Sequence, residues 1–142
     1  MIKPKLDHQV AHIIDLMPTI AEFTGSTYPA DYKGNTIIPV EGKSLVPVFK
    51  GEQRDPHDVL YWQHEGNRAV RKGDWKLVSR YDYKNMKHFP WELYNLKEDR
   101  TELNNLADAK PEMVNEMILL YDAWAKKVGV MDYGELRQMR WD

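Results

Sequence analysis

Apolar residues near the start of the chain recur at the spacing of a helix. Leu16, Ile20 and Phe23 fall on one face when residues three and four apart are aligned. Asp15 precedes them, and its side chain can accept a hydrogen bond from the free N–H groups of a first helical turn. A glycine after the segment is a natural stop. The pattern therefore predicts a short helix over residues 16–24.

The next stretch has no regular period. Residues 26–42 mix Tyr, Pro, Gly, Asn and Asp, a composition typical of an ordered loop. Ser44 can then cap a second short helix, which we expect over residues 45–50 because Gly51 would end it.

Alternating apolar and polar residues in the centre of the chain predict a small antiparallel sheet. Residues 68–72 and 75–79 flank a Gly-Asp pair, a two-residue turn that suits a β-hairpin. Residues 59–62 and 91–96 have the aromatic and branched composition of further strands. The sequence therefore predicts four strands.

The last periodic segment is the strongest helix signal. Six apolar residues recur at three- and four-residue steps: Val114, Met117, Ile118, Tyr121, Ala125 and Val128. We predict a helix over residues 111–128, preceded by a helical turn that the capping-box spacing of Asp99 and Glu102 should start. The fold class is therefore α+β, with a small four-stranded antiparallel sheet packed by a long C-terminal amphipathic helix.

Composition narrows the possible functions. The chain has 142 residues, enough for one ordinary domain, with 42% hydrophobic and 30% charged residues, as in globular proteins. A net charge of −2 gives no electrostatic case for binding nucleic acid or an anionic membrane. Because the chain has no cysteine, disulfides, thiolate metal sites and a cysteine nucleophile are excluded. No signal peptide and no apolar run long enough to span a bilayer is apparent.

Histidines near the start of the chain have a spacing that could indicate a metal site. His8 and His12 are four residues apart and Asp15 follows by three, a spacing that could place ligands on one helical face. The two histidines lie before the predicted start of the helix, so surface histidines and a capping aspartate are favoured. His57 lies in a polar loop and is interpreted as part of a turn. The sequence therefore assigns no metal ligand.

A polar cluster between two predicted strands is the candidate binding site. His64, Glu65, Asn67 and Arg68 bring an imidazole, a carboxylate, a carboxamide and a guanidinium into one short connection. Arginine and asparagine suit recognition of sulfate or sugar oxygens, because the guanidinium offers a planar fork of donors. The alternative is a polar reverse turn in which Gly66 supplies the bend. On the residues alone the reverse turn is the favoured interpretation, and only the family resemblance given below makes the binding site equally favoured.

Five segments, taken in order, resemble the C-terminal portion of bacterial sulfatases of the arylsulfatase type, in the alkaline-phosphatase-like superfamily. They are HIIDLMPTIAEFTG (12–25), EGKSLVPVF (41–49), LYWQHEGNRAVRKGDWKLV (60–78), WELYNLKEDRTELNNLA (91–107) and DAWAKKVGV (122–130). The resemblance implies that residues 1–50 pack on, or belong to, a catalytic domain. Residues 51–142 would then be the C-terminal subdomain.

The same resemblance places the chemistry elsewhere. The family's nucleophile is a formylglycine made within a Cys/Ser-x-Pro-x-Arg motif, which this sequence does not contain. Its calcium ligands and catalytic Lys and His also belong to the preceding domain. We therefore assign no catalytic and no metal residue here, and we expect the isolated chain to be inactive.

The resemblance also implies a function for the longer enzyme, which would be exported and would hydrolyse aryl or carbohydrate sulfate esters. In that enzyme this segment would complete the substrate cleft, with His64, Glu65, Asn67 and Arg68 as binding residues. The partners would be the catalytic domain and a sulfated small molecule or glycan, with self-association possible through exposed apolar helices. Two alternatives are an autonomous module that binds sulfated glycans and the C-terminal part of a related phosphoester hydrolase.

Overall fold

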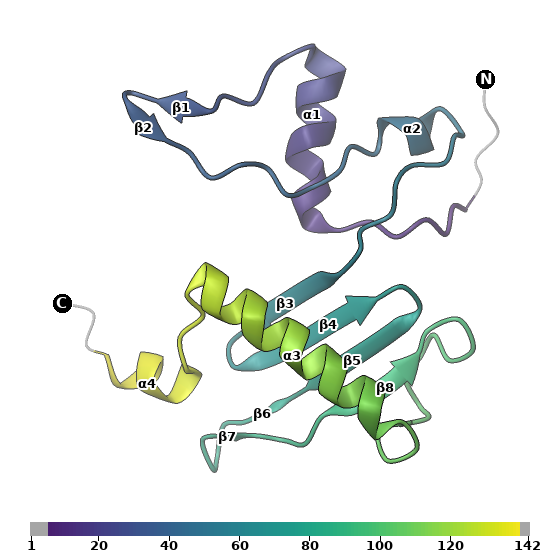
Figure 1. The fold of residues 1–142 in the computed structure, drawn as a ribbon, viewed down its shortest axis with the longest axis vertical. Helices are drawn as coiled ribbons and strands as arrows, with labels where there is room; N and C mark the ends of the chain where they lie inside the picture. Colours follow the sequence, from purple (N-terminus) through teal and green to yellow (C-terminus); the bar gives the residue numbers. More distant parts are fainter. Residues whose placement is uncertain (1–5, 140–142) are drawn as a thin grey trace. The chain divides into compact units, whose positions relative to one another are not determined.

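The computed structural model describes residues 6–139. The chain divides into two compact units, one ending at His57 and the other beginning at Asp58. Figure 1 draws the first in purple to blue and the second in teal to yellow. Each unit is described by itself.

The first unit is built from short elements. A 3₁₀ turn, η1 (Ile13–Asp15), leads directly into helix α1 (Leu16–Thr24). Gly25 ends this helix in the left-handed conformation, with φ 66°. The predicted helix over residues 16–24 is therefore confirmed.

The remainder of the first unit contains more structure than its composition suggested. Strands β1 (Asp31–Tyr32) and β2 (Asn35–Thr36) form a small hairpin within the expected loop. Helix α2 (Val46–Phe49) lies within the predicted range but is shorter than it. The Val46 N–H donates to the Ser44 hydroxyl at 3.1 Å, so Ser44 satisfies a free donor at the start of this turn, as expected.

The second unit contains the predicted sheet. Its strands are β3 (Leu60–His64), β4 (Asn67–Lys72), β5 (Trp75–Ser79) and β8 (Glu92–Asn95), all antiparallel and paired in that order. The first strand runs two residues further than predicted, because pairing with β4 continues as far as the turn between them. The four-stranded sheet is confirmed.

Helix α3 (Pro111–Val128) lies across one face of this sheet and matches the predicted range (Figure 1). Between helix and sheet lies a buried apolar core whose members are Val70, Leu77, Leu93, Met117 and Tyr121. Each strand residue in this core points to the helix face, as the two-residue period of a strand requires. The α+β fold class is therefore confirmed.

Several details of the second unit were not predicted. Strands β6 (Tyr81–Asp82) and β7 (Lys87–His88) form a second small hairpin, and helix α4 (Tyr133–Gln138) follows α3. The helical turn expected at Asp99 is wrong. The Asp99 carboxylate accepts hydrogen bonds from the N–H groups of Leu103 and Asn104, both at 2.8 Å, and so closes a loop instead.

None of the helices within residues 6–139 has the length and apolarity needed to cross a membrane.

Candidate functional site

The predicted polar cluster occupies the tight turn between β3 and β4. His64 pairs with Asn67, and the two turn residues between them have positive φ, 48° at Glu65 and 81° at Gly66. A side chain on Gly66 would put its Cβ 2.5 Å from Cγ of the Tyr81 ring. Glycine is therefore required at this position for two reasons, its backbone conformation and the close approach of the tyrosine.

Asn67 fixes this turn to the segment that follows β5. Its amide oxygen accepts from the Tyr81 N–H at 3.0 Å, and its Nδ2 donates to the His64 carbonyl at 3.2 Å and to the Tyr83 hydroxyl at 2.8 Å. The Tyr83 hydroxyl in turn donates to the Glu65 carbonyl at 3.1 Å. Because these contacts use both donors and the acceptor of the amide, Asn67 acts as a brace for the turn.

Arg68 points to the opposite face of the sheet from Asn67. Its guanidinium lies over the Trp91 ring, 4.1 Å from the centroid, and 5.8 Å from the centroid of the Tyr121 ring. Its Nε is buried and has no hydrogen-bond partner among the described residues. Burial lowers the pKa of this guanidinium, while Tyr121 and Asp122 act in the opposite direction.

The four predicted binding residues therefore form two groups. His64 and Glu65 have exposed side chains at the tip of the turn, and Asn67 braces it from within. Arg68 lies on the helix-facing side because successive strand residues alternate between the two faces. The structure thus brings three of the four together and separates the fourth.

An aromatic cluster beside the turn was missed by the sequence reasoning. The Tyr81 ring makes edge contacts with Tyr83, His88 and Tyr133 at centroid distances of 5.5, 5.1 and 5.2 Å. The only available signal was the tyrosine pair in the Tyr-Asp-Tyr run at 81–83, since strands of two residues show no period. The cluster stabilises the segment on which the turn rests.

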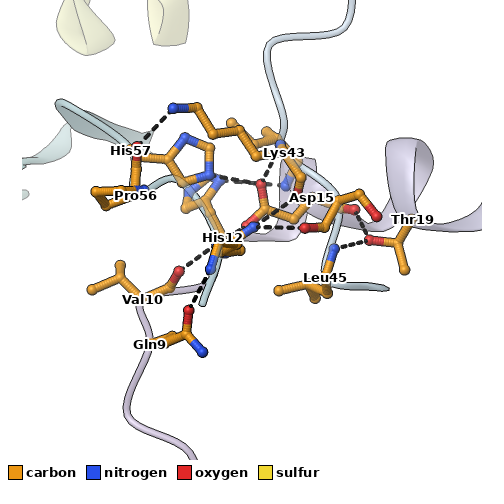
Figure 2. A network of polar contacts seen from close by, with 12 residues as sticks. Gln9, Val10, His12, Asp15, Thr19, Lys43, Leu45, Pro56 and His57 are labelled. Atoms are coloured by element: carbon orange, nitrogen blue, oxygen red, sulfur yellow. Dashed lines mark hydrogen bonds and ion pairs between the residues drawn. The ribbon is translucent and has the colours of Figure 1, made fainter. Parts of the chain in front are cut away.

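A second polar cluster lies in the first unit, around Asp15, which is fully buried. Figure 2 shows the segments that converge on its carboxylate. Oδ1 accepts from the Lys43 N–H at 2.8 Å and contacts His57 Nε2 at 2.7 Å. Oδ2 accepts from the His12 N–H at 2.8 Å and from Arg54 Nη2 at 2.9 Å. One carboxylate thus joins four separate positions of the unit.

Further contacts extend this network. The Thr19 hydroxyl donates to the Asp15 carbonyl at 2.5 Å and accepts from the Leu45 N–H at 2.9 Å. Arg54 Nη1 also donates to the Lys43 carbonyl at 2.7 Å. Backbone and side-chain donors from three parts of the unit therefore meet at one point.

The environment of Asp15 keeps it ionised. Burial alone would raise the pKa of this carboxyl, but the hydrogen bonds from Lys43, His12, Arg54 and His57 outweigh burial and lower the pKa to about 2. At neutral pH the carboxylate is therefore a buried negative charge held by the Arg54 guanidinium and three further partners.

Two sequence-based interpretations of this region are wrong. The Asp15 side chain makes no capping bond to α1, because both of its oxygens point back to the 3₁₀ turn and to residues distant in sequence. His57 is not part of a simple turn, since its side chain is only 6% exposed and contacts Asp15. His8 is exposed, and no group of three or more His, Asp or Glu residues within 6–139 is placed to hold a metal ion.

Solved structures share this architecture. One, from a study of glycosaminoglycan metabolism by Bacteroides thetaiotaomicron, has a TM-score of 0.58 and 20% identity, covering 79% of this chain and 24% of the other. Another was solved with its substrate D-glucosamine-2-N,6-O-disulfate. It has a TM-score of 0.57 and 24% identity, and the match covers 85% of this chain and 25% of the other. The fold is that of the C-terminal region of sulfatases.

Sequence comparison then gives the family. Residues 2–121 match the C-terminal model of N-sulphoglucosamine sulphohydrolase, and the chain belongs to this family of sulfatase C-terminal domains. An uncharacterized sulfatase of Schizosaccharomyces pombe is 32% identical over 136 residues, covering 92% of this chain and 24% of that protein. An N-acetylglucosamine-6-O-sulfatase of Bacteroides thetaiotaomicron is 28% identical over 105 residues, and the match covers 66% of this chain and 17% of that protein. The chain therefore spans a quarter or less of these relatives, and the resemblance to sulfatases is confirmed.

The Asp15 network leads to a stability prediction. In Asp15→Asn the new amide N–H₂ group would face the N–H groups that now donate to the carboxylate. The buried Arg54 guanidinium would also lose its negatively charged partner. We expect the first unit to lose about 3–5 kcal/mol of stability, the usual cost of breaking a buried ion pair. Amide hydrogen exchange in α1 would measure the loss.

Asp31→Asn is the matched control, because it makes the same chemical change at an exposed position. It should leave exchange in α1 unchanged. Equal protection of α1 in Asp15→Asn and in the unsubstituted chain would contradict the assigned role.

Proposed function

We propose that this chain is the C-terminal part of an enzyme that hydrolyses sulfate esters, and that its β3–β4 turn lines the substrate cleft. The observation that carries the proposal is the exposed, braced turn. His64 and Glu65 present their side chains at its tip, while Asn67, Tyr81 and Tyr83 hold the backbone in place. A rigid support of this kind is what an oriented binding group requires.

A carbohydrate sulfate is the substrate class that the relatives favour. One relative is named for a sulfate on N-acetylglucosamine, and one similar structure was solved with a disulfated glucosamine. An imidazole and a carboxylate at the tip of the turn can donate to and accept from sugar hydroxyl groups. We therefore assign His64 and Glu65 to contacts with the sugar.

The bond-breaking groups would come from the rest of the longer enzyme. The formylglycine nucleophile and the calcium ion implied by the resemblance have no motif in this sequence and no ligand set among residues 6–139. The role of this chain would therefore be to bind and orient the substrate. For that reason we expect no sulfatase turnover from the chain alone.

His64→Ala in the full-length enzyme tests this role. Loss of one oriented hydrogen bond to the substrate should raise the free energy of the transition state by on the order of 1–3 kcal/mol, which lowers kcat/KM by roughly 5- to 150-fold. Asp74→Ala is the control, since Asp74 is an exposed residue of the turn at the other end of β4. Unchanged kcat/KM in His64→Ala, with unchanged thermal stability, would show that the turn is only structural.

The outer face of the first unit is the proposed contact with the catalytic domain. Leu16, Ile20 and Phe23 are 50%, 57% and 63% exposed, and the Phe23 ring stacks on that of Phe49 at 5.8 Å. Within residues 6–57 the only buried residues are Asp15, Thr19 and Val46, so this unit keeps most of its apolar side chains on the outside. A contiguous exposed apolar face of this kind is typical of a protein–protein contact. Assignment of residues 1–50 to the junction therefore remains our proposal.

This face should cause the isolated chain to self-associate. Burial of one such side chain contributes roughly 1.5–3 kcal/mol, so several together favour association between copies. We expect sedimentation to show dimers or larger species that become monomers in the double variant Ile20→Glu, Phe23→Glu. Leu119→Glu is the control, since Leu119 is an exposed apolar residue of α3, outside the proposed face. This variant should leave association unchanged. A chain that is monomeric at high concentration would contradict this assignment.

A further inference from the structure

The guanidinium of Arg68 forms no ion pair among the described residues, and the charge of Asp122 acts on it only from beyond ion-pair distance. Its buried Nε has no hydrogen-bond partner within residues 6–139. Its contacts are the faces of the Trp91 and Tyr121 rings. The Tyr121 hydroxyl donates to Gln63 Oε1 at 2.5 Å.

Arg68 as a whole is half-buried, so a ligand could reach the terminal nitrogens of its guanidinium although Nε is buried. Stacking on an indole stabilises a cation through the face of the guanidinium, whereas its N–H groups lie in the plane and remain unused. A partly buried charge without hydrogen bonds carries a desolvation cost that an anion could offset. The two rings also fix the plane of the fork, so its orientation is set before any ligand arrives.

His88 supplies a second unsatisfied group on the same side. Its Nδ1 is buried and has no hydrogen-bond partner in the described chain. Burial lowers the pKa of this imidazole, and the charge of Arg68 lowers it further, while Asp132 opposes both. The His88 ring makes an edge contact with the Tyr81 ring at a centroid distance of 5.1 Å, and the Tyr81 ring lies against Gly66, two residues before Arg68. His88 is held there by pairing with Tyr81, which is itself bonded to Asn67.

We propose that Arg68 and His88 bind an anionic group of a sugar ligand, a sulfate or a carboxylate, that is different from the ester to be hydrolysed. The inference rests on the proposed function for the identity of the ligand. Arg68 faces the helix side of the sheet, away from the exposed tip at His64, so the two sets of groups would contact different substituents. The preferred substrate would therefore be a sugar with two acidic groups, such as a disulfated hexosamine or a sulfated uronic acid.

The test is an NMR titration of this chain with sodium sulfate and, separately, with sodium glucuronate, at ionic strength held constant with sodium chloride. We expect saturable shifts of the Trp91 indole N–H and the Arg68 side-chain N–H with at least one of the two anions. Arg68→Gln should bind roughly tenfold or more weakly, since it loses a charged hydrogen-bond donor. His88→Asn should bind about fivefold more weakly.

Arg80→Gln is the matched control. Arg80 also lies over an aromatic ring, that of Phe89 at 5.2 Å, but it is exposed. Its replacement should leave the dissociation constant unchanged. An equal loss of binding in Arg80→Gln would indicate a diffuse charge effect and overturn the proposal.

Two other results would also overturn it. Absence of saturable shifts at Trp91 up to on the order of 100 mM of both anions would mean that Arg68 only packs on the aromatic rings. This measurement uses the unsubstituted chain, so it decides the question even if Arg68→Gln fails to fold. A response in the isolated chain that is absent from the full-length protein would mean that a carboxylate of another domain occupies the site.

The outcome is separable from that of the proposed function. Anion binding at Arg68 in a protein without sulfatase activity would uphold this site and refute the hydrolase assignment. Normal sulfatase turnover with no anion binding at Arg68 would uphold the hydrolase assignment and refute this site.

Discussion

Burial of the Asp15 carboxylate is the constraint on which the first unit depends. A buried charge is stable only when it is paired and hydrogen-bonded, and here four donors reach it from residues 12, 43, 54 and 57. Those donors fix where the chain must pass after α1 and after α2. Because the interior of the unit is polar, its apolar side chains are left on the outside, where they form the proposed contact with a catalytic domain.

The second unit is organised in the opposite way, around an apolar core between the sheet and α3. Successive residues of β4 point to opposite faces of the sheet and therefore make different contacts. Val70 and Arg68 face the helix, one within the core and the other on the Trp91 ring, while Asn67 braces the turn. The core therefore positions both the exposed tip at His64 and the Arg68 guanidinium, which forms no ion pair among residues 6–139. Of the residues proposed to bind a ligand, His64 and Arg68 lie on strands of the sheet, whereas Glu65 lies in a turn and His88 in the hairpin of β6 and β7.

The elements that the sequence predicted well are those with a strong period. The six apolar steps of α3 and the Gly-Asp turn between β4 and β5 are local signals, so their positions followed directly from the residues. The two-residue strands β6 and β7 have too few residues to show a period. Asp15 was misinterpreted because its position before a helix suggests a cap, whereas its partners Lys43, Arg54 and His57 lie 28, 39 and 42 residues away. Such long-range contacts leave no local pattern.

The candidate site, too, was predicted from the sequence only in part. The polar run at 64–68 was visible in the sequence, but proximity along the chain suggested one cluster where strand geometry makes two groups. The involvement of His88 was not apparent, since it depends on the hairpin of β6 and β7. The assignment of the β3–β4 turn and Arg68 to substrate binding is best tested by a crystal structure of the full-length enzyme with an unhydrolysed disulfated sugar. We expect His64 and Glu65 to lie within about 3 Å of sugar oxygens and the second acidic group of the sugar to lie on Arg68. A sugar bound elsewhere, with the whole β3–β4 turn facing solvent, would show that this turn does not bind the substrate.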